Sequence, residues 1–106
     1  MAIKFLALNL QLLDLRSNSI SREIPENIGN LRNIQGLLLS GNQIEGVIPK
    51  SIGKLSKMSD VDLSVNRIVR GLLETIGNLT ALQNLELSDN QINGKIYQIQ
   101  LEISFR

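Results

Sequence analysis

A period of 24 residues organises most of this chain. Four asparagines recur at that interval, and the full set is Asn18, Asn42, Asn66 and Asn90. Apolar residues keep the same interval in several columns, among them Leu13, Leu37, Val61 and Leu85, and Leu15, Leu39, Leu63 and Leu87. Self-similarity at a fixed period indicates a repeat architecture, in which each unit buries its apolar side chains against its neighbours. The predicted fold is therefore a stack of similar units.

The register of these columns divides the chain into units. It predicts a remnant of a preceding unit at residues 1–9, full units at 10–33, 34–57 and 58–81, a partial unit at 82–96 and a divergent tail at 97–106. Within each unit the two apolar columns alternate with polar neighbours, which is typical of a short strand with one buried face. One strand per unit predicts a parallel sheet with neighbouring strands about 4.8 Å apart.

The asparagine column stands where the chain must turn off each strand. An asparagine side chain both donates and accepts hydrogen bonds, so stacked asparagines can satisfy buried backbone groups in consecutive turns. We therefore expect a structural role for Asn18, Asn42, Asn66 and Asn90. A glycine column, suited to close packing or unusual backbone angles, consists of Gly29, Gly53 and Gly77.

Composition removes several classes of function. The chain has no His and no Cys, which excludes imidazole and thiolate catalysis, the commonest zinc sites and any disulfide framework. Its net charge is +1, from 11 basic and 10 acidic residues, so it lacks the basic excess of a nucleic-acid-binding protein. Its apolar content comes mostly from 19 Leu and 14 Ile, with only 3% aromatic residues. We expect no enzymatic activity, no cofactor and no nucleic-acid partner.

The N-terminal segment MAIKFLALNLQLLDL is not typical of a secretory signal peptide. Asn9 and Gln11 interrupt its apolar run, and no small-x-small cleavage site follows. No stretch of the sequence approaches the roughly 18 apolar residues that a membrane span needs. We therefore expect neither a signal peptide nor a membrane span in this chain.

The run at residues 37–55, LLLSGNQIEGVIPKSIGKL, resembles the plant-specific class of leucine-rich repeat, whose pattern is LxxLxLSxNxLxGxIPxxIGxLxx. The resemblance covers residues 10–96. It implies an α/β-type solenoid with a concave parallel β-sheet, short 3₁₀ turns and minor strands on the convex side. The glycine of GxIP is replaced by Arg22 and Arg70 in two units, where we expect irregular pairing of the convex strands.

The same resemblance implies a non-catalytic module that recognises a protein or peptide ligand, with a co-receptor as a second partner. Plant proteins of this class form the ectodomains of receptor-like kinases and receptor-like proteins in defence or development, at the extracellular face of the plasma membrane or in the apoplast. Two alternatives stay open: a secreted inhibitor similar to polygalacturonase-inhibiting proteins, and a truncated fragment without independent activity. The family's Cys-containing caps are not seen, so we expect self-association through the uncapped ends.

The outward positions of the concave strands are the candidate partner-binding face. They are Leu12, Asp14, Arg16, Leu38, Asp60, Asp62, Asn84 and Glu86. Four carboxylates make this face acidic, while Leu38, and Val65 beyond a strand end, place apolar groups where water is expected. The alternative interpretation is a solvated surface with incidental apolar residues. Asp60 and Asp62, about 7 Å apart on one strand face, lack the cleft that an acid–base pair needs, so we expect a solvated pair.

Two further features lie outside the repeat columns. Asn78-Leu79-Thr80 is the single N-x-S/T sequon, and in a secreted chain we expect Asn78 to be exposed and glycosylated. In the tail, apolar and polar residues alternate from Tyr97 to Arg106, which predicts a strand. That strand either folds over the last unit as a cap or leaves an unpaired edge.

Overall fold

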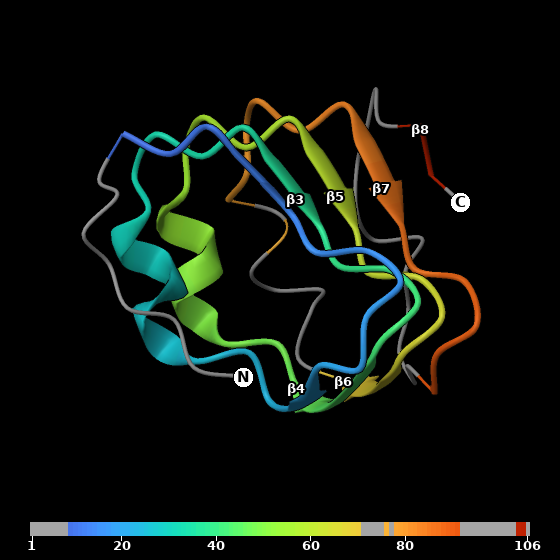
Figure 1. The fold of residues 1–106 in the computed structure, drawn as a ribbon. Coiled ribbons are helices and arrows are strands. Elements are labelled where there is room, and N and C mark those ends of the chain that lie inside the picture. Colours follow the sequence, from blue (N-terminus) through green and yellow to red (C-terminus); the bar gives the residue numbers. More distant parts are fainter. Residues whose placement is uncertain (1–8, 71–75, 77, 92–103, 106) are drawn as a thin grey trace.

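The computed structural model describes residues 9–70, 76, 78–91 and 104–105 as a stack of repeats (Figure 1). Five strands form one parallel sheet in the order β1-β3-β5-β7-β8. They are β1 (Leu12–Asp14), β3 (Gly36–Leu38), β5 (Asp60–Asp62), β7 (Asn84–Glu86) and β8 (Ser104–Phe105). Leu37 pairs with Leu13 on one side and with Val61 on the other, so a sequence column forms a row across the sheet. The predicted solenoid with its concave parallel sheet is confirmed.

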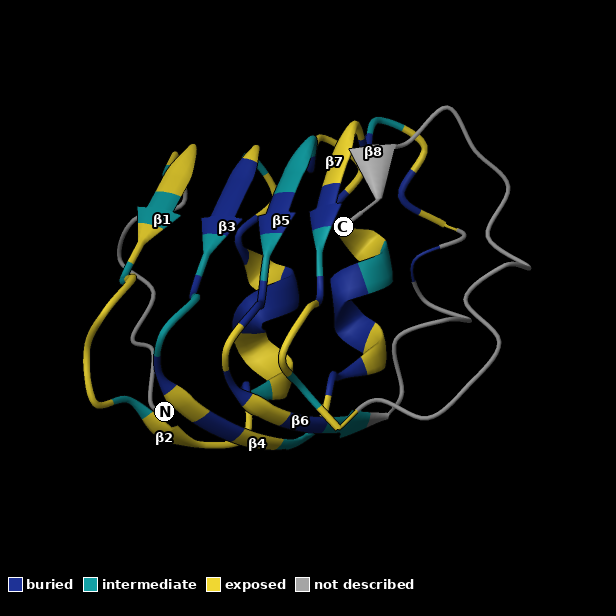
Figure 2. Cartoon of the chain, turned by 90° about the vertical axis from the view of Figure 1, so that its right-hand side faces the viewer, coloured by how far each residue is buried: buried dark blue, intermediate teal, exposed yellow. Residues whose placement is uncertain are grey.

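A second parallel sheet lies across the core from the first, in the order β2-β4-β6 (Figure 2). It contains β2 (Ser21–Arg22), β4 (Gln43–Val47) and β6 (Arg67–Arg70). Its pairing shifts register after Gly46, which pairs with Ile68, whereas Val47 pairs with Arg70. Arg22, at the repeat position that Gly46 occupies, has a φ of 72°, a backbone conformation that favours glycine. The expected irregular pairing is found at Arg70, whereas the expectation is wrong for Arg22, where β2 and β4 pair without a register shift.

Two 3₁₀ helices, η1 (Glu26–Asn30) and η2 (Lys50–Lys54), pack side by side along one flank of the stack (Figure 1). Each follows a proline in extended conformation, whose fixed φ sets where the turn begins. Gly29 permits the close approach of the two helices, because a Cβ at this residue would lie 2.7 Å from the Cβ of Ser51. Gly29 does not have a positive φ, so this member of the glycine column serves close packing.

Leucine and isoleucine side chains from both sheets and both 3₁₀ helices form one continuous core. Its central members include Ile34, Leu37, Leu39 and Ile44, each with 0% exposure. Their counterparts one repeat earlier are only partly buried against that core, and they are Leu10, Leu13, Leu15 and Ile20. Leu85 and Leu87 in the last described repeat are buried. Self-association through the ends stays a prediction.

β8 extends the sheet at its C-terminal side. Ser104 pairs with Asn84 and Phe105 with Leu85, both in parallel. Of the two alternatives for the tail, this pairing fits a strand that folds over the last repeat. The rest of the tail at 97–103 and 106, the apolar positions Ile92 and Ile96, and the N-terminal segment 1–8 lie outside the described residues.

The asparagine side chains join consecutive repeats through hydrogen bonds. The Oδ1 atom of Asn66 accepts the backbone N–H of Ile44, in the preceding repeat, at 3.0 Å. Its Nδ2 donates to three backbone carbonyl oxygens, those of Leu39, Leu63 and Ser64. Asn42 and Asn90 make equivalent sets of bonds. The exposed Asn18 donates to Leu15 and Arg16 of its own repeat.

Candidate functional site

The solvent-facing side of the five-stranded sheet, here called the concave face, carries seven of the eight candidate partner-binding residues in two rows, and Arg16 follows the end of β1. One row contains Leu12, Gly36, Asp60 and Asn84, and the other contains Asp14, Leu38, Asp62 and Glu86. Neighbours within a row lie on adjacent strands, about 4.8 Å apart. Four candidates are exposed, namely Leu12, Asp14, Arg16 and Asn84, and four are half-buried, namely Leu38, Asp60, Asp62 and Glu86. The sheet therefore brings residues from four repeats onto one surface.

Apolar groups gather where β1 meets β3. Leu12 is 53% exposed, and a Cβ on its row neighbour Gly36 would lie 2.7 Å from the Cδ1 atom of Leu12. Leu12 therefore leans over Gly36, and the missing side chain of the glycine leaves room for it. Leu38 lies two residues further along β3, on the same face of the sheet. We name Leu12, Gly36 and Leu38 the apolar corner of the concave face.

Arg16 is the cation that accompanies the candidate carboxylates. Its Nε donates to Oδ1 of Asp14 at 2.8 Å and its Nη2 to Oδ2 at 2.7 Å, so the ion pair is bidentate. The side-chain and backbone hydrogen bonds from Arg16 lower the pKa of Asp14 below its ordinary value. The hydrogen bond to Asp14 raises the pKa of Arg16, and the charges of Asp62 and Asp60 contribute in the same direction. The positive charge of Arg16 therefore interacts electrostatically with the carboxylates of β5 as well as with Asp14.

The strands β5 and β7 form the acidic half of the concave face. Ser64 donates its backbone N–H and its hydroxyl to Oδ1 of Asp62, at 3.1 and 2.7 Å. Ser64 is itself buried, so these bonds hold the Asp62 carboxylate at a defined place on the surface. Within the described residues, no cation forms an ion pair with Asp60 or Asp62. Together with Glu86 on β7, these residues present a negative surface that is suited to a cationic partner.

The loop that leaves each concave strand contains a residue in left-handed backbone conformation. These residues form one column, and their φ values are 57° at Ser17, 70° at Gly41, 52° at Val65 and 56° at Asp89. Val65 is also 52% exposed. Sequence reasoning missed this column because glycine occupies only one of its four positions. The 24-residue period is the signal that connects the other three to Gly41.

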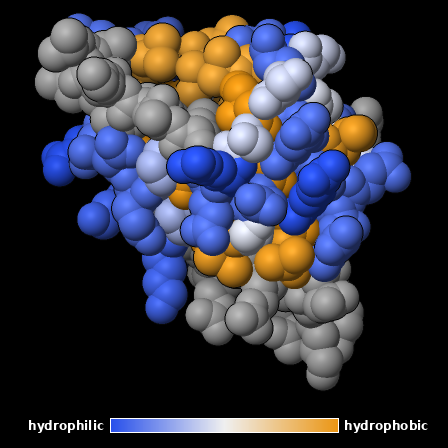
Figure 3. All heavy atoms as spheres, turned by 60° about the horizontal axis from the view of Figure 1, so that its bottom comes forward, coloured by the Kyte–Doolittle hydropathy of each residue, from blue (hydrophilic) through white to orange (hydrophobic). Residues whose placement is uncertain are grey.

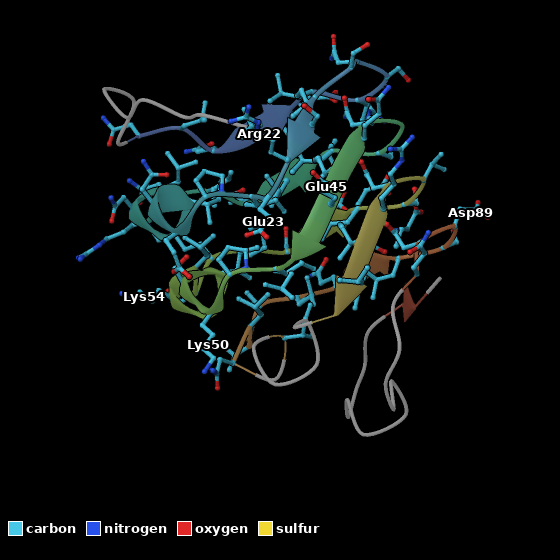
Figure 4. All side chains as sticks on the ribbon, turned by 90° about the horizontal axis from the view of Figure 1, so that it is seen from below. Arg22, Glu23, Glu45, Lys50, Lys54 and Asp89 are labelled. Atoms are coloured by element: carbon cyan, nitrogen blue, oxygen red, sulfur yellow. The ribbon has the colours of Figure 1, made fainter. Side chains whose placement is uncertain are left out.

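The second sheet carries charges of both signs, and η2 carries positive charges. Arg22, Glu23 and Glu45 are exposed on or beside the second sheet, and Lys50 and Lys54 project from η2 (Figure 4). Figure 3 shows this side of the molecule, where hydrophilic side chains separate patches of hydrophobic atoms. A concentration of carboxylates with few cations is therefore a feature of the concave face.

The described residues contain neither a metal-binding cluster nor a membrane-spanning helix. Within residues 9–70, 76, 78–91 and 104–105, no three His, Cys, Asp or Glu side chains are grouped so that they could hold a metal ion. Across that same part of the chain, no helix has the length and apolar character of a membrane span.

Asn78 and Thr80 of the sequon are exposed, and Leu79 between them is buried. The Asn78 side chain is therefore accessible from solvent.

Comparison with protein families matches residues 4–101 to the leucine-rich repeat region. Comparison with curated protein sequences gives no match. Among solved structures, a chain of the BIR3–SERK2 complex from Arabidopsis thaliana is 33% identical with a TM-score of 0.75, over 79% of this chain and 45% of that one. The Arabidopsis receptor kinase HAESA, in complex with the peptide hormone IDA and the co-receptor SERK1, is 33% identical with a TM-score of 0.76, over 81% and 14%.

The same repeat occurs outside plants. A leucine-rich-repeat protein of Leptospira interrogans is 33% identical with a TM-score of 0.81, over 92% of this chain and 25% of that one. The chain therefore spans less than half the length of each of these three similar chains. Two of the three come from complexes of Arabidopsis proteins.

Proposed function

Because this chain belongs to the leucine-rich-repeat family, we propose that it is a non-catalytic recognition module whose concave face binds a protein or peptide segment with basic side chains. Leucine-rich repeats stack into an extended concave surface, and repeat proteins use such surfaces for binding. The proposal concerns the concave face as defined above. It does not involve the second sheet or the flank formed by η1 and η2.

The observation that supports the proposal most directly is the charge and exposure pattern across the concave strands. Asp60, Asp62 and Glu86 lie in the acidic half, next to the apolar corner, on a chain whose net charge is only +1. Arg16 supplies an internal example of the contact that we propose, because its guanidinium binds the Asp14 carboxylate with two hydrogen bonds. An arginine of a partner can bind a carboxylate of the acidic half in the same way.

We further propose that the module works as part of an extracellular plant receptor, either a receptor-like kinase or a receptor-like protein. The support is the similarity to the HAESA and BIR3–SERK2 structures, of which the first contains a peptide hormone and a co-receptor. On this proposal the chain contacts a peptide ligand and a co-receptor outside the cell. The exposed sequon at Asn78 then carries a glycan.

The experiment is a selection of short random peptides against the immobilised chain, followed by calorimetric titration of the enriched sequences. We expect enrichment of Lys and Arg, and binding that weakens as salt is added. Asp60→Asn with Asp62→Asn should abolish the enrichment, while the amide oxygen introduced in place of the Asp62 carboxylate can still accept the hydrogen bonds from Ser64. The matched control is Glu23→Gln with Glu45→Gln, which removes the same charge from the second sheet. Equal losses in both double variants would contradict a concave binding face.

A further inference from the structure

Val65 combines two features that are each unfavourable for the isolated fold. Its φ of 52° lies in the left-handed region, where a β-branched residue is a steric outlier. Its side chain is 52% exposed, so it contributes little to the core in return. The other members of its column are Ser17, Gly41 and Asp89, which are smaller or better suited to this conformation.

Neighbouring repeats impose the backbone conformation on Val65. The N–H of Val65 donates to the carbonyl oxygen of Ser88 at 2.9 Å, and the next N–H, of Asn66, donates to the carbonyl oxygen of Asp89. On the other side the Gly41 N–H donates to the carbonyl oxygen of Ser64. With both sides of the loop bonded, the chain cannot relax the left-handed turn locally, and the strain persists in the folded state.

The position of Val65 connects it to the acidic half of the concave face. Val65 follows Ser64, whose backbone N–H and hydroxyl hold the Asp62 carboxylate. Val65 comes three positions after Asp62 in the chain, which limits the distance between their Cα atoms to about 10 Å. Val65, with its exposed apolar side chain, therefore lies within about 10 Å, between Cα atoms, of a residue whose carboxylate is held in place.

We propose that Val65 is a specificity-determining contact for the ligand of the concave face. The occupant is a peptide segment that carries a Lys or Arg on Asp60 and Asp62 and an aliphatic side chain on Val65. In an extended peptide each residue advances about 3.3 Å, so the aliphatic residue lies within about three positions of the basic one. This inference rests on the proposed function, and it adds the second chemical group that the ligand must have.

The backbone strain at Val65 and its proposed contact with the ligand predict that one substitution raises stability and lowers affinity. Val65→Asn removes the aliphatic contact and places at this position a residue that tolerates the left-handed region. We expect the melting temperature to rise by about 4 °C or more, while the affinity for a selected peptide falls about tenfold. Val65→Gly should likewise raise the melting temperature and lower the peptide affinity. It controls for any new contact made by the asparagine side chain itself.

The matched control is Val47→Asn, which removes an exposed valine from β4 on the second sheet. Val47 does not have a positive φ, so the control should not raise the melting temperature, and it should leave peptide affinity unchanged. The measurement uses the full chain, a selected basic–aliphatic peptide, and the same peptide with its aliphatic residue changed to Ser. The Ser peptide should bind the wild-type chain and Val65→Asn equally.

The outcomes separate the two proposals. If basic peptides bind through Asp60 and Asp62 but Val65→Asn leaves their affinity unchanged, the role of Val65 is refuted and the proposed function stands. Selected peptides without an aliphatic residue within three positions of the basic one would refute it as well. If no basic peptide binds the wild-type chain, the proposed function and this inference both fail.

Discussion

The side-chain oxygen of Asn66 accepts the backbone N–H of Ile44, a residue of the preceding repeat, at 3.0 Å. The Ile44 N–H is buried, so without this acceptor it would be left unpaired away from water. Asn66→Ala should therefore lower the free energy of unfolding by roughly 1–3 kcal/mol, measured by urea denaturation. The matched control is Asn18→Ala, because Asn18 is exposed and bonds within its own repeat. Equal losses in the two variants would contradict a ladder between repeats.

The contact between Gly29 and Ser51 gives two substitutions with opposite effects. The Ser51 hydroxyl is buried and has no hydrogen-bond partner among the described residues. Ser51→Ala keeps the Cβ that packs on Gly29 and removes the unpaired group, so we expect stability to rise by about 1 kcal/mol. Gly29→Ala adds a methyl group against the Cβ and carbonyl oxygen of Ser51 and should lower the denaturation midpoint. A destabilised Ser51→Ala chain would show that the hydroxyl has a partner in solution.

The Asp14–Arg16 pair predicts a pH effect on the concave face. Arg16 lowers the pKa of Asp14 below its ordinary value of 3.8. The pair therefore favours the folded chain above that value, and this contribution disappears as the pH falls through the lowered pKa of the folded state. Because the pair is exposed, its effect on stability is small, and carboxyl NMR titration is the suitable measurement.

Arg16→Gln should return the pKa of Asp14 toward 3.8 and leave the concave face more negative. Selected basic peptides should then bind more tightly, because Arg16 no longer competes for the carboxylates. Arg67→Gln, at an exposed position on β6, changes the net charge equally and should leave the Asp14 pKa unchanged. An unshifted Asp14 resonance in Arg16→Gln would refute the ion pair.

The sequon predicts one modification in a secreted form of the chain. Expressed with a signal peptide in plant cells, the protein should carry one N-linked glycan, at the exposed Asn78. Mass spectrometry should show that both Asn78→Gln and Thr80→Ala lack it. A glycan that persists in Asn78→Gln would place the modification at another residue, and a fully secreted chain without any glycan would contradict the accessibility of Asn78.

Much of the fold could be predicted from the sequence because the same local pattern of apolar and polar residues occurs in four repeats. The alternation around Leu13, Leu37, Val61 and Leu85 predicts the strands, and these residues do pair across the sheet. The left-handed column could not be predicted in the same way, since Ser17 and Val65 are not residue types that identify such a backbone conformation. Their conformation follows from hydrogen bonds to neighbouring repeats, which no single position in the sequence reports.

The sequence could predict which residues of the candidate site share one face of the sheet, but not which of them contact one another. Strand periodicity places Asp14, Asp60 and Asp62 on the same side of the sheet. The pairing of Asp14 with Arg16 was missed, although two residues two apart at the end of one strand lie on the same side and could have indicated it. The contact of Leu12 with the space above Gly36 depends on a rotamer, which the sequence alone does not determine.

The most direct test of the recognition face is amide chemical-shift mapping of the isotope-labelled chain with a selected basic peptide. We expect the largest shifts at β3, β5 and β7, from residues Gly36–Leu38, Asp60–Asp62 and Asn84–Glu86. Amides of β4 and of η2 should stay unshifted, because they lie on the second sheet and the flank. Shifts confined to Lys50–Lys54 or to Gln43–Val47 would contradict a concave recognition face.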